Sequence, residues 1–140
     1  MSVYLDASVL LPTLVTEPRS KAVERFLGQA DDGLVVSEFA AAEVASGISR
    51  LVRTRVLAPD FADSRLTEFD LWREDRTVAI EIEGADVRSA AMIVRRFELM
   101  LRTPDALHIA ICRRLDASLA TLDLRLAEVA VELGVKIAPI

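Results

Sequence analysis

The sequence predicts an α/β protein in which a parallel sheet is covered by helices on both faces. Its apolar runs are short, as at residues 3–5 and 34–36, and each is followed by residues that favour a helix start. Short strands that are apolar throughout, rather than alternating, are typical of parallel sheets buried on both sides. Right-handed crossovers through the helices would then connect the strands.

Apolar spacing, capping residues and β-branched composition predict the individual elements. We expect strands over residues 2–6, 34–36, 77–82, 118–121 and 135–138. We expect helices over residues 8–13, 20–28, 37–55, 59–75, 87–101, 103–114 and 123–133. Ser8 and Ser37 are suitable N-caps, and Pro59 suits the first position of a helix.

Two helices have a predicted buried face. In the helix after Asp86, apolar residues recur at spacings of three and four. They are Val87, Ala90, Ala91, Val94, Phe97 and Leu101. In the helix after Ser37 the apolar stripe consists of Ala40, Val44, Ile48 and Leu51.

Length and composition favour one soluble domain over residues 1–140. The 140 residues are 52% apolar, which is enough for a core. Cys112 is the only cysteine, so an intramolecular disulfide is excluded. No run approaches the roughly 20 apolar residues of a membrane span, and the N-terminus lacks the pattern of a signal peptide. We therefore expect a cytoplasmic protein with no membrane partner.

The charge balance narrows the possible partners. A formal net charge of −5 argues against a protein that coats nucleic acid through bulk electrostatics. It leaves room for a nucleic-acid enzyme with a local basic rim. Of the 17 basic residues, 15 are Arg, which binds phosphate bidentately. A genome rich in G and C gives the same bias.

Four acidic residues are candidates for one site. Asp6 ends the first strand, Asp105 follows the helix start Thr103-Pro104, and Asp123 follows the fourth strand. The carboxyl ends of parallel strands and the adjacent helix starts share one edge, where ligands bind. Acidic, oxygen-rich pockets suit Mg²⁺ or Mn²⁺. The alternative for each Asp is a capping or helix-dipole role.

Glu43 differs because it lies in the middle of a helix. It borders the predicted buried face, beside Phe39 and Gly47, where the charge of a Glu needs a partner or contact with water. It either joins the acidic site, pairs with an Arg, or is a solvated edge residue. His108, the only histidine, lies three residues after Asp105. It is either a ligand or general base, or a structural residue of its helix.

Four stretches together resemble the PIN-domain ribonucleases, specifically the VapC-type toxins of bacterial toxin–antitoxin pairs. They cover residues 3–8, 36–43, 102–110 and 120–126, in the order the family has. The resemblance implies a three-layer α/β/α sandwich with a five-stranded parallel sheet in the order 3-2-1-4-5. It also implies that Asp6, Glu43, Asp105 and Asp123 are the metal-site acids, with Ser8 and Thr121 as supporting groups.

The same resemblance implies an activity and partners. The expected reaction is endonucleolytic hydrolysis of RNA, such as tRNA or rRNA, by a water bound to Mg²⁺ or Mn²⁺. Asp6 and Asp105 are the expected direct ligands, and Glu43 and Asp123 bind directly or through water. The expected partner is a small VapB-type antitoxin, with the toxin as a homodimer in a heterotetramer or larger complex.

Other interpretations of the sequence remain open. A receiver-like phosphorylation module also gathers acids at strand ends, but Glu83 stands where it would need an Asp. A non-catalytic interaction module on the same fold is the second alternative. Arg95-Arg96 and Arg113-Arg114 either contact RNA phosphates or form solvated helix faces. Cys112 is expected in the core. Leu51, Val52, Val56 and Leu57 either dock an antitoxin or complete the core.

Overall fold

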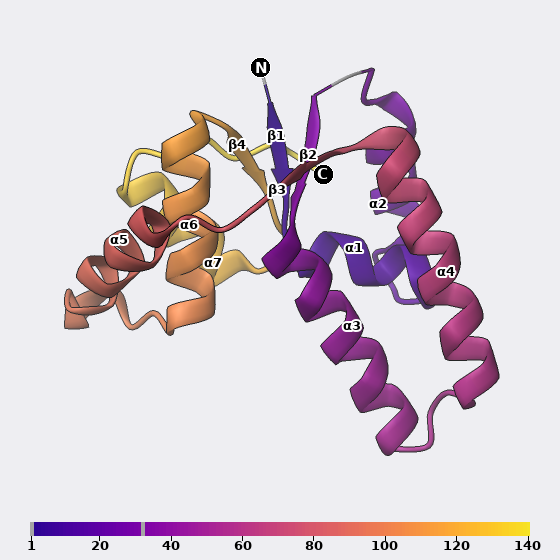
Figure 1. Ribbon diagram of the computed structural model, residues 1–140. Helices are drawn as coiled ribbons and strands as arrows, with labels where there is room; N and C mark the ends of the chain where they lie inside the picture. Colours follow the sequence, from indigo (N-terminus) through magenta and orange to yellow (C-terminus); the bar gives the residue numbers. More distant parts are fainter. Residues whose placement is uncertain (1, 32) are drawn as a thin grey trace.

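A computed structural model describes residues 2–31 and 33–140 as one parallel sheet between two layers of helices (Figure 1). The strands are β1 (Val3–Leu5), β2 (Leu34–Ser37), β3 (Val78–Ile80) and β4 (Ser118–Ala120). The helices are α1 (Ala7–Leu14), α2 (Ser20–Gln29), α3 (Glu38–Arg53), α4 (Pro59–Arg76), α5 (Gly84–Val94), α6 (Thr103–Leu115) and α7 (Leu124–Glu132), with a 3₁₀ turn, η1 (Phe97–Leu99).

The strand order is β3-β2-β1-β4, and every pair is parallel. Tyr4 lies between Val35 and Leu119 in the register, so β1 is the central strand between β2 and β4. The predicted order of the first four strands is confirmed. β3 lies at the edge, and Val78 there is 57% exposed, so this strand is not the buried one that its composition predicted.

The prediction of a fifth strand at residues 135–138 was wrong. This segment pairs with the sheet through a single parallel bridge between Leu119 and Ile137. The physical reason lies in β4, which stops at Ala120. The next residues turn into the acidic edge, where the Leu122 amide donates to Ser8 Oγ at 2.8 Å. The final segment therefore finds too little of β4 to form a ladder.

Alternate residues of the strands serve two separate cores. Tyr4, Val35 and Leu119 face α5, α6 and α7. Leu5 and Val36 face α1, α2, α3 and α4. Both faces of the sheet are thus buried, which explains why the strands are continuous apolar runs in the sequence. Figure 1 shows the two groups of helices on opposite sides of the strands.

The long helix predicted after Asp86 was wrong in length, and its predicted buried face was right only for Ala90, Val94 and Leu101. α5 ends at Val94, and Phe97 in η1 is 83% exposed. The buried face of α5 runs through Asp86, Ala90 and Ile93. A charged residue occupies a core position there, because Asp86 binds Arg114 of α6. A pattern of apolar residues alone cannot reveal such a face.

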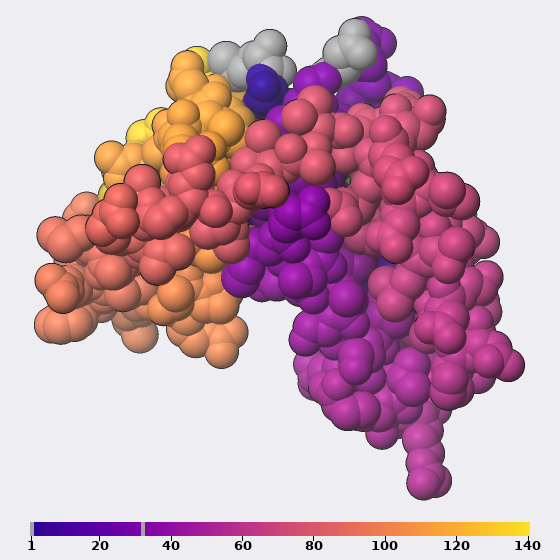
Figure 2. Space-filling model, viewed as in Figure 1, coloured from indigo at the N-terminus to yellow at the C-terminus, as the bar shows by residue number. Residues whose placement is uncertain are grey.

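The carboxyl ends of β1 and β4 meet beside the starts of α1, α3, α6 and α7. In Figure 2 the surface is notched between α6 on one side and α3 on the other, near this edge. None of the helices within residues 2–31 and 33–140 has the length and apolarity needed to cross a membrane. The fold thus presents one concave edge on which several polar side chains converge.

Candidate active site

Asp6 directly follows β1 and is the N-cap of α1. Its Oδ1 accepts hydrogen bonds from the backbone amides of Ser8 and Val9, at 3.0 and 3.3 Å. The prediction of Ser8 as the cap was therefore wrong by two residues. Asp6 is only 4% exposed, so its carboxyl group is buried at the carboxyl-terminal edge of the sheet.

Ser8 and Thr121 hold the Asp6 carboxylate from both sides. Ser8 Oγ donates to Oδ1 at 2.6 Å, and Thr121 Oγ1 donates to Oδ2 at 2.5 Å. The two hydroxyls are also 3.2 Å apart. Thr121 in turn accepts the backbone amide of Asp123 at 3.1 Å. The residues predicted as supporting groups thus fix both the acid of β1 and the turn after β4.

Asp105 and Asp123 stand at two helix starts. Asp105 lies in the first turn of α6, is partly buried, and makes no hydrogen bond or ion pair within the part of the chain that the structure describes. Asp123 is the N-cap of α7, and its Oδ1 accepts from the amides of Arg125 and Leu126. The capping alternative is confirmed for Asp123, and its second oxygen is left for another partner.

Glu43 reaches the same edge from α3 and is held there by His108. Glu43 Oε1 lies 2.5 Å from His108 Nε2. His108 Nδ1 lies 2.7 Å from the Tyr4 hydroxyl, which lies 2.7 Å from Ser37 Oγ. His108 is 3% exposed. The acid at the border of the buried face therefore pairs with the histidine, not with an Arg.

Burial and like charges make two of these carboxyl groups hard to ionise. Burial raises the pKa of Asp6, although the hydrogen bonds from Ser8 and Thr121 work in the opposite direction. Burial also raises the pKa of Asp105, and the negative charges of Asp123 and Glu43 add to the effect. Two of the other three acids, Asp123 and Glu43, thus repel the charge of Asp105. A cation placed among them would relieve this repulsion.

The acidic edge suits a hard divalent ion, because the side-chain atoms there that could ligate a metal are carboxylate and hydroxyl oxygens. Within residues 2–31 and 33–140, no three His, Cys, Asp or Glu side chains lie close enough together to ligate one ion. Mg²⁺ usually keeps several waters and takes only one or two carboxylates directly. The arrangement therefore suits an ion bound partly through water.

Several other predicted candidates have structural roles. Arg114 makes a bidentate pair with Asp86 at 2.8 Å and is not a free phosphate ligand. Arg96 pairs with Glu98 at 2.9 Å. Cys112 is buried as expected, and burial raises the pKa of its thiol to about 12. The structure thus leaves the acidic edge as the main candidate site.

The link from Tyr4 through His108 to Glu43 is not found by sequence reasoning. The sequence pattern gives Tyr4 only the role of a strand residue and pairs His108 with no acid. Two features could have suggested the link. His108 lies one helical turn after Asp105, and Glu43 sits at a half-buried position where a Glu needs a partner. They become neighbours only because α3 and α6, from opposite helix layers, reach the same edge of the sheet.

The sequence matches the PIN domain family over residues 3–132. The chain therefore belongs to the PIN-domain family. Ribonuclease VapC46 of Mycobacterium tuberculosis is 32% identical to it over 139 residues, which are 97% of this chain and 95% of the relative. Ribonuclease VapC3 of Pyrobaculum aerophilum is 29% identical over 128 residues, 91% of this chain and 94% of the relative. The PIN domain is of the VapC type.

Solved structures share the fold of this PIN domain. VapC20 of Mycobacterium tuberculosis, described as a toxin that cleaves the sarcin–ricin loop, matches with a TM-score of 0.75 at 15% identity. The match covers 99% of this chain and 100% of that one. VapBC-1 from nontypeable Haemophilus influenzae matches with a TM-score of 0.68 at 15% identity, over 99% and 97% of the two chains. The predicted family and α/β fold are confirmed.

Proposed function

We propose that this PIN domain is a metal-dependent endoribonuclease and the toxin of a toxin–antitoxin pair. The observation that carries the proposal is the acidic edge, where burial raises the pKa of Asp6, and burial together with the charges of Asp123 and Glu43 raises the pKa of Asp105. Such a cluster is stabilised by a cation, and its oxygen donors suit Mg²⁺ or Mn²⁺. The names of the VapC relatives support ribonuclease activity on this fold.

Each residue of the edge has a proposed part in the reaction. When bound, the ion would lower the pKa of a water and offset charge on the phosphate. Asp6 and Asp105 would bind it directly, and Glu43 and Asp123 directly or through water. Ser8 and Thr121 keep Asp6 oriented by donating to both of its oxygens. His108 engages Glu43, which fixes the acid that α3 contributes.

The proposed substrate is structured RNA such as tRNA or rRNA, cut to leave a 5′-phosphate in the cytoplasm. The cleavage of the sarcin–ricin loop by VapC20, a toxin of the same fold, supports a structured substrate. In this chain the notch beside the acidic edge would receive the phosphodiester (Figure 2). The rival function is a non-catalytic interaction module, in which the same acids only cap helices.

Incubation of purified protein with total RNA separates the two functions. We expect cleavage with Mg²⁺ or Mn²⁺ and none in EDTA. Asp6→Asn should lower the rate by orders of magnitude, because it removes a ligand charge but keeps an oxygen that can cap α1. Cleavage that persists in EDTA, or in Asp6→Asn at the original rate, would contradict the proposal and favour a different chemistry.

The proposed partner is a small VapB-type antitoxin bound to a homodimer of this chain. Fold neighbours that are toxin–antitoxin complexes support this partner. An inhibitor of an acidic edge can insert a cationic residue, and Arg suits carboxylates because it binds them bidentately. We therefore expect the antitoxin to extend an Arg or Lys toward Asp6 and Asp105.

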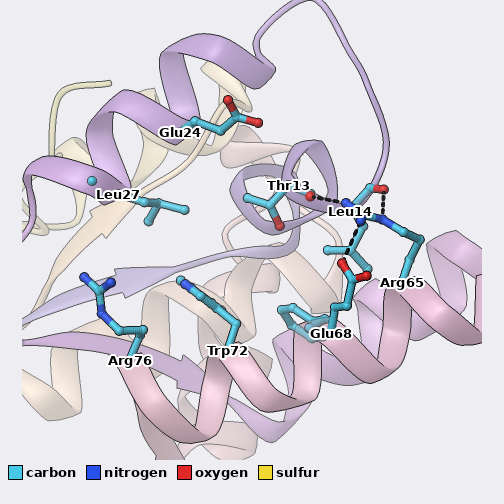
Figure 3. A pocket seen from close by; sticks show the side chains of 10 residues that line it. Thr13, Leu14, Glu24, Leu27, Arg65, Glu68, Trp72 and Arg76 are labelled. Atoms are coloured by element: carbon cyan, nitrogen blue, oxygen red, sulfur yellow. Dashed lines mark hydrogen bonds and ion pairs between the residues drawn. The ribbon is translucent and has the colours of Figure 1, made fainter.

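A groove between α2 and α4 is the proposed docking place for the rest of the antitoxin. It has a volume of about 340 Å³, and Leu27 and Trp72 point into it from the two helices (Figure 3). Arg65 closes one end by donating to the carbonyls of Thr13 and Leu14. An apolar side chain of a bound peptide would be buried there. Of the docking residues predicted from sequence, Leu51, Val52 and Leu57 pack against the core instead, and Val56 is exposed.

A substitution at Gly28 tests this docking place without disturbing the core. Gly28 lines the groove, and a Cβ added there meets no atom within 4 Å. Gly28→Arg should therefore fold normally, keep ribonuclease activity and lose the co-expressed antitoxin in a pull-down. Val56→Asp, an exposed change outside the groove, serves as the control. Full antitoxin recovery with Gly28→Arg would rule out the groove.

A further inference from the structure

Glu43 is the end of a line of hydrogen bonds that links α3, α6, β1 and the end of β2. The line runs from Glu43 through His108 and Tyr4 to Ser37, whose Oγ accepts the Ala40 amide at 2.9 Å. It begins on α3 and returns to the N-cap of the same helix. His108 of α6 and Tyr4 of β1 are its two interior members, and both are buried.

The available hydrogens give this line a direction. Ser37 Oγ accepts from Ala40, and its own hydrogen can go to the Tyr4 oxygen. Tyr4 then gives its single hydrogen to His108 Nδ1, so the imidazole hydrogen lies on Nε2 and is donated to Glu43. Every hydrogen in this arrangement has an acceptor. In the opposite direction, the Ser37 hydroxyl hydrogen has none within residues 2–31 and 33–140.

The His108 ring is also held by its neighbours. The Tyr4 and Phe39 rings stand 5.6 and 5.3 Å from it, tilted by 55° and 57°. A buried ring wedged between two aromatic side chains and anchored at Nδ1 cannot turn freely. Its Nε2 hydrogen therefore points to one place, which is Glu43 Oε1. The second oxygen of Glu43 has no hydrogen-bond partner in the part of the chain that the structure describes.

We propose that His108 is a positioning residue that fixes the Glu43 carboxylate by donating to Oε1, which leaves Oε2 for the acidic edge. The inference rests on the proposed function, because a fixed Glu43 matters only if its free oxygen serves an ion or the phosphate. It assigns His108 neither a ligand nor a general-base role. Tyr4 contributes by holding the ring through Nδ1.

Two amide variants of His108 separate positioning from mere packing. The side-chain nitrogen of Gln lies as many bonds from Cα as Nε2 does, so His108→Gln keeps a donor for Glu43. The amide of Asn corresponds instead to Nδ1, so His108→Asn keeps a partner for Tyr4 and loses the donor to Glu43. Both are neutral amides at the same buried position, which makes each the control for the other.

We expect His108→Asn to weaken Mn²⁺ binding, measured by calorimetry on the protein without RNA, by on the order of 10- to 100-fold. kcat for RNA cleavage should fall by a similar factor with little change in KM. His108→Gln should keep most of both. Equal losses in the two variants, or no loss in either, would overturn the proposal, because a packing role does not distinguish them.

Tyr4→Phe supplies an independent measurement should His108→Asn melt far below the original protein. It removes one hydroxyl and keeps the ring, so the fold is retained while Nδ1 loses its anchor. We expect weaker Mn²⁺ binding than in the original protein, and unchanged binding would contradict the proposal. Failure of the proposed function has a different signature, since the original protein itself would then neither bind Mn²⁺ nor cleave RNA. That result would overturn both.

Discussion

Asp6 combines a capping role with a charge that its surroundings disfavour. Its Oδ1 caps α1, and both oxygens accept hydroxyl hydrogens. Burial nevertheless raises its pKa. The folded state therefore binds a proton at Asp6 more readily than the unfolded state. The stability linked to this group declines as pH rises from the ordinary Asp pKa through the raised folded value. At neutral pH the ionised, buried carboxylate therefore weakens the protein.

Asp6→Asn and Asp6→Ala should therefore differ in stability. In EDTA at neutral pH, we expect Asp6→Asn to melt at or above the temperature of the original protein, since it keeps the cap and loses the charge. Asp6→Ala should be less stable than Asp6→Asn by about 1 kcal/mol, because the amides of Ser8 and Val9 lose their acceptor. Thermal melts measure both. If Asp6→Asn melts well below the original protein, the Asp6 charge stabilises the fold through its hydrogen bonds, which would contradict a carboxylate disfavoured by burial.

Asp105 offers a simpler case, because it has no hydrogen-bond partner among the described residues to lose. Replacing it with Asn removes a charge that Asp123 and Glu43 repel. We expect Asp105→Asn to abolish divalent-dependent RNA cleavage while leaving the melting temperature in EDTA unchanged or higher. Asp60→Asn, an exposed acid in the first turn of α4, is the control. A loss of stability in Asp105→Asn would show that the acid serves its helix.

At the scale of elements, α5 is fastened to α6 by one buried ion pair. The Asp86 carboxylate accepts two hydrogen bonds from Arg114 and also caps the Glu83 amide. Burial opposes ionisation of Asp86, but the hydrogen bonds and charge of Arg114 outweigh it, so its pKa is lowered. The stabilisation is present above the ordinary Asp pKa and is lost as pH falls through the lowered folded value.

Arg114→Gln should therefore destabilise the protein by about 3 kcal/mol at neutral pH, because it leaves Asp86 buried without its charge partner. Arg113→Gln, at the exposed neighbouring position, should change stability little. The gap between the two variants should narrow as pH falls and close below the lowered pKa of Asp86, where the carboxyl group takes up a proton even beside Arg114. Urea unfolding at several pH values measures this, and a gap independent of pH would exclude the ion pair as its cause.

The order and type of the elements could be predicted from sequence, because each strand and most helices carry local information. Ser37 as the cap of α3 and Pro59 at the start of α4 were both found this way. The buried face of α5 was found only in part, at Ala90 and Val94, since an acid, Asp86, fills one of its core positions. The prediction of a strand at residues 135–138 failed because its pairing with β4 depends on where β4 turns, which local composition does not encode.

At the scale of the whole molecule, the site is made by four elements that are far apart in sequence. The parallel order brings the ends of β1 and β4 together, which could be predicted for Asp6 and Asp123. The contact of Glu43 with His108 could not, because it depends on how closely α3 and α6 approach across the sheet. The proximity of these like-charged side chains at the acidic edge is therefore a property of the assembled fold.

Mn²⁺ should stabilise the whole protein by binding at the acidic edge, because only the folded state brings these acids together. We expect millimolar Mn²⁺ to raise the melting temperature of the original protein more than that of Asp6→Asn. Melts with and without the ion, for both proteins, provide the comparison. Equal shifts in the two proteins would mean that the ion binds elsewhere.

Metal-dependent hydrolysis at the acidic edge is tested most directly by the chemistry of the RNA ends after cleavage. We expect the protein with Mn²⁺ to produce 5′-phosphate and 3′-hydroxyl ends, because a water activated at the edge attacks the phosphorus. Products with 5′-hydroxyl and 2′,3′-cyclic phosphate ends, formed equally well in EDTA, would show that the RNA 2′-hydroxyl is the nucleophile. That result would contradict a metal-dependent site at Asp6 and Asp105.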